Sequence, residues 1–429
     1  MPDAATGDQA HRDDQAHRDR GGRRAPGLLE LSGTSLWLGV IGFGGGVSVL
    51  GTMHHLVVER RRWLTEREFN NMATVAQMLP GGAAANALAQ MGLRFRGLSG
   101  AGAAYAGFIL PGFLATLALA WGFVRFGVTP RAGIVLSGLN AAVVGIIAAL
   151  ALQMVRTSVA RLWQMAVALA ALLLSLAGGA PSGEVAVLGI GAGLVLDMLA
   201  KRARLWRFRR APRRPSPPVA LPDEGQPLER VSSGRDPREP PGCAGIAPAA
   251  FTIKGAGVLL GLALLFFRTG FGAYGGGFAI VPSLHASVVG AGLVTEQQFA
   301  NAVAVGKLTP GPVLLMATFI GYVISGPMGA IVATVSIFAA PFLLVVALGA
   351  WLLRMRSRRV VRAALRGLTP AVVGLMAAAA LTLGATLRGP ADIGIAAGTA
   401  LTLARFRINP ALLLAVAAAV RWGLSLGGL

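Results

Sequence analysis

The chain contains the same series of motifs twice, and corresponding positions such as Pro80 and Pro310 are 230 residues apart. The first copy reads GFGGG (42–46), WLTEREF (63–69) and LPGG (79–82), and the second reads GFGAYGGG (270–277), LVTEQQF (293–299) and LTPGP (308–312). The copies stay in step further on, where GLNAAVVG (138–145) matches GLTPAVVG (367–374). This long repeat predicts two halves with the same fold.

Composition indicates that both halves lie in a membrane. Apolar residues make up 54% of the chain and charged residues only 13%, and apolar runs near or above 18 residues recur. The net charge of +21 is carried by short basic clusters between the apolar runs. The positive-inside rule explains such clusters better than nucleic-acid binding does. We therefore predict an all-α polytopic membrane protein.

The apolar segments define about five membrane-spanning helices in the first half. They lie near residues 31–58, 98–124, 132–155, 162–180 and 184–200. Between the first two is an uncharged stretch, 69–92, that is interrupted by Pro80 and Gly81 and has arginines on both sides. Because both flanks are basic, we interpret this stretch as a re-entrant Pro-Gly hairpin with both ends on the cytoplasmic side. A full crossing is the alternative.

Loop charges in the second half are exchanged relative to the first. The loop 285–296 has no Lys or Arg, whereas its counterpart in the first half is rich in arginine. The loop 354–366 carries six arginines, whereas its counterpart is nearly bare. This exchange predicts two inverted-topology repeats, each with about five helices and one hairpin. Full crossings would instead give parallel halves.

The same patterns divide the chain into four parts. Residues 1–30 are expected to form a disordered polar tail rather than a signal peptide. The first repeat covers 31–200, and the second covers 251–429. Between them, 201–250 is rich in Pro, Arg, Asp and Glu, which predicts a flexible basic cytoplasmic linker.

The Pro-Gly interruptions are the strongest candidates for a substrate site. A helix that begins inside a membrane presents unpaired N–H groups and a partial positive charge, which suit an anion. The glycine clusters of both repeats favour discontinuous helices near the same place, although tight helix packing is the alternative. The candidate binding residues are Gly44, Gly45, Gly46, Gln77, Pro80, Gly81, Gly82, Asn86, Gly275, Gly276, Gly277, Lys307, Thr309, Pro310, Gly311 and Pro312.

Lys307 is the one ionisable residue of the second hairpin, three positions before Pro310. Gln77 occupies the same position before Pro80. An ammonium group inside a membrane is a functional candidate, with a structural ion pair or contact with the interface as alternatives. The combination of an amide and an ammonium predicts an asymmetric anion site.

Other polar residues are candidates for ion coupling or for anion attraction: His54, Glu66, Arg268 and Glu296. For the histidines, including His55 and His285, a solvated or capping role at a helix end is the favoured alternative. The matched Thr-Glu pairs are interpreted first as helix starts.

Enzymatic chemistry has no visible motif in this sequence. HExxH, Walker A and dinucleotide-binding glycine patterns are missing, and Cys243 is the single cysteine. We therefore expect no enzyme activity, no cofactor, no metal site and no nucleic-acid partner.

Several of these motifs together resemble the chromate transporter family. The resemblance rests on GFGGG with Met53-His54 and ERRRW (59–63), on LPGG, and on GGGFAIVP (275–282), TEQQF and LTPGPVLLMATFIGY (308–322). It covers nearly the whole chain apart from the tail and linker. The resemblance implies a secondary active transporter that exports chromate across the bacterial cytoplasmic membrane, driven by the proton gradient or the membrane potential.

The resemblance leaves alternatives in substrate and mechanism. Sulfate or an organic anion could be transported, or the protein could be a passive anion channel. The partners are a small inorganic oxyanion and the bilayer, and a homodimer is the oligomer considered. The sequence departs from the family pattern at Lys307, where the family usually has Gln, and at Gly46 and Gly82, where it usually has Pro.

Overall fold

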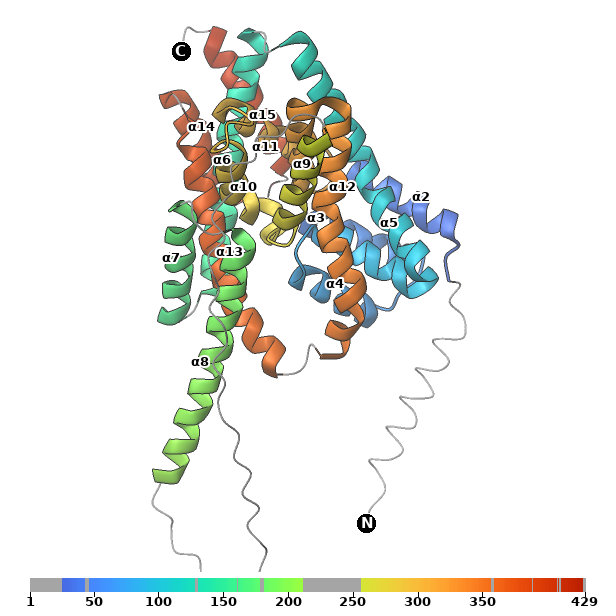
Figure 1. Cartoon of the computed structure of the whole chain (residues 1–429), viewed down its shortest axis with the longest axis vertical. Coiled ribbons are helices and arrows are strands. Elements are labelled where there is room, and N and C mark those ends of the chain that lie inside the picture. Colours follow the sequence, from blue (N-terminus) through green and yellow to red (C-terminus); the bar gives the residue numbers. More distant parts are fainter. Residues whose placement is uncertain are drawn as a thin grey trace, which may run out of the picture. The chain divides into compact units, whose positions relative to one another are not determined.

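The computed structural model describes residues 25–42, 46–127, 130–159, 161–177, 181–210, 256–355, 359–387, 389–406, 408 and 410–426. Every element within these ranges is a helix, as the hydropathy pattern predicts (Figure 1). Among the described residues, five helical stretches are long and apolar enough to cross a membrane: Ala83–Phe126, Gly133–Thr157, Ser182–Leu199, Val313–Arg354 and Ala363–Gly384. Shorter apolar helices lie at Leu28–Ile41, Leu162–Leu176, Gly257–Gly270 and Leu412–Leu426.

The two halves contain helices in the same order. The first half consists of α2 (Leu28–Ile41), α3 (Gly46–His54), η1 (His55–Arg60), α4 (Glu66–Met78), α5 (Ala83–Phe126), α6 (Pro130–Ser158), α7 (Leu162–Leu176) and α8 (Ser182–Arg210). The second half consists of α9 (Ala256–Gly270), η2 (Gly275–Ile280), α10 (Val281–Val288), α11 (Glu296–Leu308), η3 (Val313–Leu315), α12 (Met316–Met355), α13 (Arg359–Gly384), α14 (Pro390–Arg405) and α15 (Pro410–Leu426).

Contacts along the chain group the residues into compact units. Met1–Val195 and Ile253–Leu429 together form one unit, and Leu196–Thr252 forms a second. The predicted tail 1–30 and linker 201–250 fall mostly outside the described residues. Both repeats therefore contribute to one unit, which is the unit described below.

The Thr-Glu motifs start helices, as predicted. Thr65 is the N-cap of α4, where its side chain accepts a hydrogen bond from the backbone N–H of Glu68 and the Glu68 side chain accepts one from the Thr65 N–H. Thr295 and Gln298 form the same capping box at the start of α11. Each box satisfies two backbone N–H groups that the first turn of a helix leaves unpaired.

Each Pro-Gly motif breaks the chain between two helices. After α4, Leu79 is extended, Gly81 adopts a φ of 102°, and α5 begins at Ala83. After α11, Thr309 is extended, Gly311 adopts a φ of 110°, and η3 leads into α12. Both tips need a glycine because a side chain disfavours this positive φ. The chain doubles back at the first break, since α4 and α5 pack against each other.

A second turn follows each break and divides α5 and α12 into a short segment before the turn and a longer one after it. Non-helical angles at Arg96 and Gly97 divide α5, and the same angles at Ser325 and Gly326 divide α12. The helical segments before and after each turn pack closely against each other at glycines. A methyl group on Gly92 would lie 2.2 Å from the Gly100 carbonyl oxygen, and one on Gly321 would lie 2.3 Å from that of Gly329.

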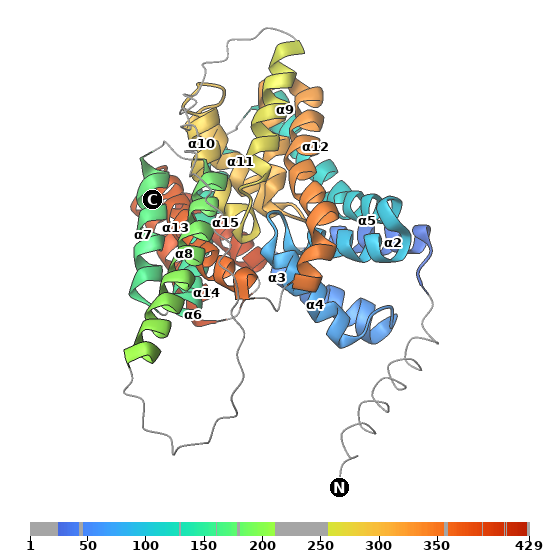
Figure 2. The same cartoon turned by 60° about the horizontal axis from the view of Figure 1, so that its bottom comes forward.

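The two halves are interleaved. In the first half α2 packs on α5, and in the second half α9 packs on α12. Across the halves, α5 packs on α12, α6 packs on α13, α14 and α15, and α13 also packs on α7. Both views place α6, α7, α13 and α14 together (Figures 1 and 2). Neither half therefore forms its core alone.

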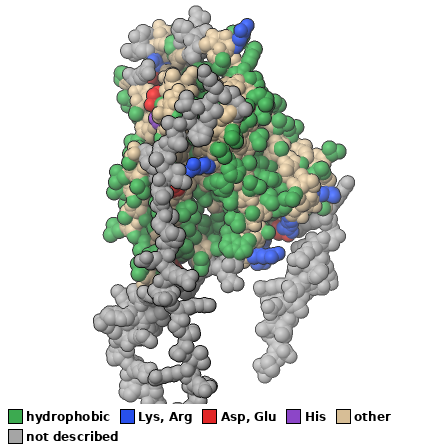
Figure 3. Space-filling view, viewed as in Figure 1, with side chains coloured by type: hydrophobic (Ala, Val, Ile, Leu, Met, Phe, Trp, Pro, Cys, Tyr) green, Lys and Arg blue, Asp and Glu red, His purple; other side chains and the backbone are tan. Residues whose placement is uncertain are grey.

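The surface of this unit fits a lipid environment. Large apolar side chains are exposed on several helices, among them Trp37 (49%), Trp121 (53%) and Trp351 (51%). In Figure 3, hydrophobic side chains cover much of the visible described surface, and Lys and Arg appear in only a few places. A water-soluble protein rarely exposes such wide apolar areas.

Close packing at one break yields a prediction about stability. A methyl group on Gly112 of α5 would lie 2.1 Å from the Pro310 carbonyl oxygen, whereas one on Gly122 of the same helix would meet nothing within 4 Å. We expect Gly112→Ala to destabilise the protein by about 1–3 kcal/mol through overpacking. Gly122→Ala should be neutral or slightly stabilising, because alanine favours a helix by up to about 1 kcal/mol over glycine. Thermal unfolding in detergent measures both, and equal midpoints for the two variants would contradict the packing described.

Candidate functional site

The two Pro-Gly breaks lie against each other. A methyl group on Gly82 would be 3.2 Å from both Cβ and Cγ of Pro312. These residues come from different halves and stand at equivalent places, each immediately before the helix that follows the break. The sequence predicted both breaks but could not show that they touch.

Each break is hydrogen-bonded to the glycine-rich segment of the opposite half. The Gly81 N–H donates to the Ala273 carbonyl oxygen at 2.8 Å, and the Gly311 N–H donates to the Gly42 carbonyl oxygen at 3.0 Å. Gly42 and Ala273 occupy matching positions in the two glycine-rich motifs. The two bonds are therefore equivalent and reciprocal.

The prolines inside the long helices lie beside the same breaks. A methyl group on Gly81 would lie 2.7 Å from Cβ of Pro341 in α12, and Gly112, next to Pro111 in α5, lies against the Pro310 carbonyl. Each break is thus enclosed by the long helix of the other half.

The second glycine cluster is a broken segment of backbone. Gly275, Gly276 and Gly277 have φ angles of 61°, 73° and 96° and begin the short helix η2. A methyl group on Gly277 would lie 2.4 Å from Cδ1 of Leu314, next to the second break. In the first cluster, Gly44 and Gly45 lie outside the described residues, and Gly46 begins α3.

Lys307 is a buried cation close to the second break. Its side chain is 7% exposed, and its Nζ lies 5.2 Å from the centroid of the Phe278 ring in η2. No hydrogen bond or ion pair joins Lys307 to another residue in the described part of the chain. The ammonium group is thus placed inside the protein without a carboxylate partner there, so the structural ion pair considered from the sequence is not found.

The remaining predicted polar residues stabilise the breaks. Asn86 donates from Nδ2 to the Pro80 carbonyl at 2.8 Å and to the Ala76 carbonyl at 3.2 Å. Gln77 is exposed and donates to the Ala73 carbonyl within the same helix at 3.1 Å. Thr309 is buried, and its hydroxyl donates to the Val305 carbonyl at 3.0 Å.

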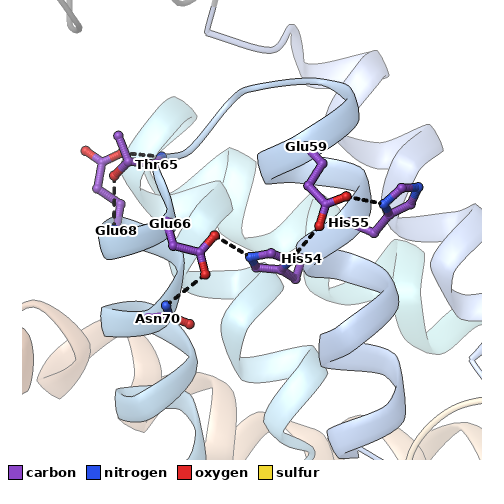
Figure 4. Close-up of polar contacts among 7 residues, drawn as sticks. All are labelled: His54, His55, Glu59, Thr65, Glu66, Glu68 and Asn70. Carbon is purple, nitrogen blue, oxygen red and sulfur yellow. Dashed lines mark hydrogen bonds and ion pairs between the residues drawn. The ribbon is translucent and has the colours of Figure 1, made fainter.

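A matched His-Glu pair stands at the start of each hairpin. His54 Nε2 lies 2.7 Å from Glu66 Oε2, and His285 Nε2 lies 2.6 Å from Glu296 Oε2. Figure 4 shows the first pair, with Asn70 donating to Glu66 at 3.2 Å. The hydrogen bond from His54 holds the pKa of Glu66 below its ordinary value.

These pairs connect helix ends and do not reach the breaks. Each histidine also contacts a phenylalanine edge to face, His54 with Phe69 at 5.0 Å and His285 with Phe299 at 5.1 Å. Both glutamates are largely exposed. Arg268 is exposed near the end of α9. Both His-Glu pairs therefore join neighbouring helix ends.

Sequence reasoning missed several buried polar contacts. The Thr116 hydroxyl of α5 donates to the Thr309 hydroxyl at 3.1 Å, and Asn140 Nδ2 donates to Asn301 Oδ1 at 3.2 Å. Arg421 Nε donates to Asp392 Oδ1 at 3.0 Å. Asn140 and this ion pair line a cavity of about 300 Å³, together with Ser137, Gln297 and Thr386. Only the Asp392–Arg421 pair had a signal in the sequence, because Asp392 is an isolated acid in an apolar stretch.

The central arrangement suits a small anion better than a metal ion. It combines two adjacent helix breaks, hydroxyl and amide groups, and a buried ammonium group. Within the described residues, no group of three or more His, Cys, Asp or Glu side chains could hold a metal ion.

Comparison with known proteins agrees with this architecture. A family described as Chromate transporter matches residues 29–196 and 260–422. A "Probable chromate transport protein" of Synechococcus elongatus is 31% identical over 83% of this chain and 84% of its own length. The "Chromate transport protein" of Cupriavidus metallidurans is 31% identical over 81% and 80%, and that of Pseudomonas aeruginosa is 27% identical over 82% and 80%.

No solved structure matches the chain. The family match covers both halves, and the relatives are matched over most of their own length. This chain belongs to the chromate transporter family.

Proposed function

We propose that this chain is a secondary active transporter that exports chromate, or a similar tetrahedral oxyanion, across the bacterial cytoplasmic membrane. The observation that carries the proposal is the buried Lys307 beside two helix breaks that meet. The names of the relatives support chromate as the substrate.

The charge of Lys307 is the main reason to expect an anion. A buried ammonium group loses its hydration and needs a compensating negative partner. The described residues supply no carboxylate partner for Lys307, so a bound dianion is the partner we propose. Unpaired N–H groups at a helix start would add a further favourable interaction with the same anion.

We propose that each break is the tip of a re-entrant hairpin. Both α4 and α11 contain 13 residues. A helix of that length spans about 20 Å, whereas the apolar core of a bilayer is about 30 Å thick. One limb is therefore too short to cross. The reciprocal bonds between the halves and the exchanged loop charges support the inverted repeat.

The driving force we propose is the membrane potential or the proton gradient. A dianion that leaves a cell with a negative interior moves down the potential, which contributes about 2.3 kcal/mol per charge for each 100 mV. Export therefore requires no ATP-binding motif, in keeping with the sequence. Transport that does not respond to an imposed potential or pH gradient would favour a passive channel.

Substrate choice is tested by competition. Sulfate has the shape and charge of chromate, so it should compete for a site that recognises tetrahedral dianions. If excess sulfate or an organic anion displaced chromate transport completely and was itself transported faster, that anion would be the substrate.

Lys307 gives the sharpest prediction for this function. Lys307→Met keeps the length of the side chain but removes its charge, and we expect chromate affinity to fall roughly 10- to 100-fold, because a hydrogen bond to a charged group is worth about 1.5–3 kcal/mol. Chromate uptake into vesicles that contain the purified protein measures this loss.

Matched variants separate the site from general charge effects. Arg405→Gln removes an exposed cation at the end of α14 and should leave transport unchanged. Lys307→Arg should retain part of the activity. Unchanged transport in Lys307→Met, with the variant present in the membrane, would remove Lys307 from the binding site.

We further propose that the His-Glu pairs fix the hairpin ends rather than relay protons. At neutral pH we expect Glu66→Gln to lower the unfolding midpoint. Because the folded pKa of Glu66 is lowered, the stability from the ionised carboxylate is present above its unfolded pKa and is lost as the pH falls through its folded pKa. The difference from the natural protein should therefore disappear in acid.

Thermal unfolding across pH measures this effect, with Glu184→Gln, an exposed acid on α8, as the control. Transport by Glu66→Gln should keep its usual pH profile. A shifted pH profile at unchanged stability would instead make Glu66 part of proton coupling.

A further inference from the structure

Gln90 is a buried amide without a partner. It lies in α5, one helical turn after Asn86, and is only 4% exposed. Neither its Nε2 nor its Oε1 forms a hydrogen bond within the part of the chain that the structure describes. Oδ1 of Asn86 is likewise buried and unpaired there. Both amide atoms of Gln90 and the side-chain oxygen of Asn86 thus lack partners on one face of the helix.

Such a side chain weakens the folded state unless something binds it. A buried amide has given up its bonds to water and gains nothing in return when no partner is present. The other repeat has an apolar side chain at the matching point, since Phe319 precedes Gly321 by two positions as Gln90 precedes Gly92, and Phe319 is 1% exposed. An apolar residue therefore fits this place in the fold, and Gln90 calls for a separate explanation.

The surroundings of Gln90 define a seam between α5 and α12. A methyl group on Gly349 of α12 would lie 3.5 Å from Cγ of Gln90, and Gly81 lies against Pro341 of the same helix. The two segments thus run side by side from the first break. About one turn beyond Gln90 and Gly349 come Arg94 and Arg354, which are both exposed. Arg94 is paired with Glu68.

The matching seam in the other repeat is apolar. It contains Phe319 in α12 and Leu119 in α5, at the positions equivalent to Gln90 and Gly349. Val323 and Val124 take the positions of the two arginines, and the Phe123 and Phe319 rings pack at 5.0 Å. The amide and the two arginines of the first seam therefore have apolar residues at the equivalent positions of the second seam.

We propose that Gln90 is a binding residue for the transported oxyanion, on a route along the α5–α12 seam that leads from Arg94 and Arg354 to the helix breaks. This inference rests on the proposed transport function. The Nε2 group of Gln90 donates to an oxyanion oxygen, and Oε1 accepts from the water that accompanies the anion. The arginines raise the local anion concentration where the route begins.

Replacement by an apolar residue tests this role. Gln90→Ile removes an unpaired buried amide, so the unfolding midpoint should stay equal or rise. Chromate transport should nevertheless fall at least roughly tenfold in kcat/KM, because one polar contact to the substrate is lost. Gln153→Leu, which changes an exposed glutamine on α6, should affect neither quantity.

Thiol labelling tests the route without relying on transport. In a Cys243→Ser background, a negatively charged membrane-impermeant reagent should modify Gln90→Cys, and chromate or sulfate should slow the reaction. Ile320→Cys, at a buried position beside Phe319 in the apolar seam, is the control and should react at least about tenfold more slowly, because a thiol in apolar surroundings is inert.

The outcomes separate this inference from the function on which it rests. Full transport by a well-folded Gln90→Ile, or equal reactivity at positions 90 and 320, would overturn the role of Gln90 while transport by the natural protein stood. If Gln90→Ile fails to fold, the labelling decides alone. Labelling of Gln90→Cys without protection by either anion, together with no anion transport by the natural protein, would overturn both proposals.

Discussion

Two backbone hydrogen bonds hold the centre of this protein together. At each Pro-Gly break the helix bonding stops, and an N–H group inside an apolar structure must find another acceptor. The Gly81 N–H finds it on Ala273, and the Gly311 N–H finds it on Gly42. Each half thus completes the backbone of the other, and the centre cannot form within one half. Small residues then allow the approach, because Gly82 and Gly112 leave room for Pro312 and the Pro310 carbonyl.

The same joint explains why the candidate site is asymmetric. The backbone of the two halves matches at the breaks, but the side chains differ. Lys307 in the second half stands at the position that Gln77 occupies in the first half. The partner-free amide of Gln90 also belongs to one half only, since Phe319 replaces it in the other. A duplicated framework can therefore carry one asymmetric site, because the two halves differ in side chains at equivalent positions.

Much of the framework could be predicted from local signals. Thr65 and Thr295 begin helices because their side chains accept hydrogen bonds from the first turn, and the glycines at 81 and 311 adopt the positive φ that a break requires. These features depend on neighbouring residues, so sequence spacing reveals them. The contact between the breaks, the Thr116–Thr309 bond and the Asp392–Arg421 pair join residues far apart in the chain. A single sequence shows which residue types are present but does not show which distant residues contact each other. The roles predicted for Gly44 and Gly45 stay predictions, since these residues lie outside the described ranges.

Cross-linking of the two breaks tests the central claim most directly. Cysteines at Gly82 and Pro312, in a Cys243→Ser background with a protease site inserted between the halves, should form a disulfide under mild oxidation in the membrane, because their Cβ atoms lie close enough for one. After cleavage the halves should then stay together on a non-reducing gel and separate when reduced. The pair Gly97→Cys and Pro312→Cys serves as the control and should not link. Failure of the first pair to link, in a protein that still transports its anion, would contradict the meeting of the two breaks.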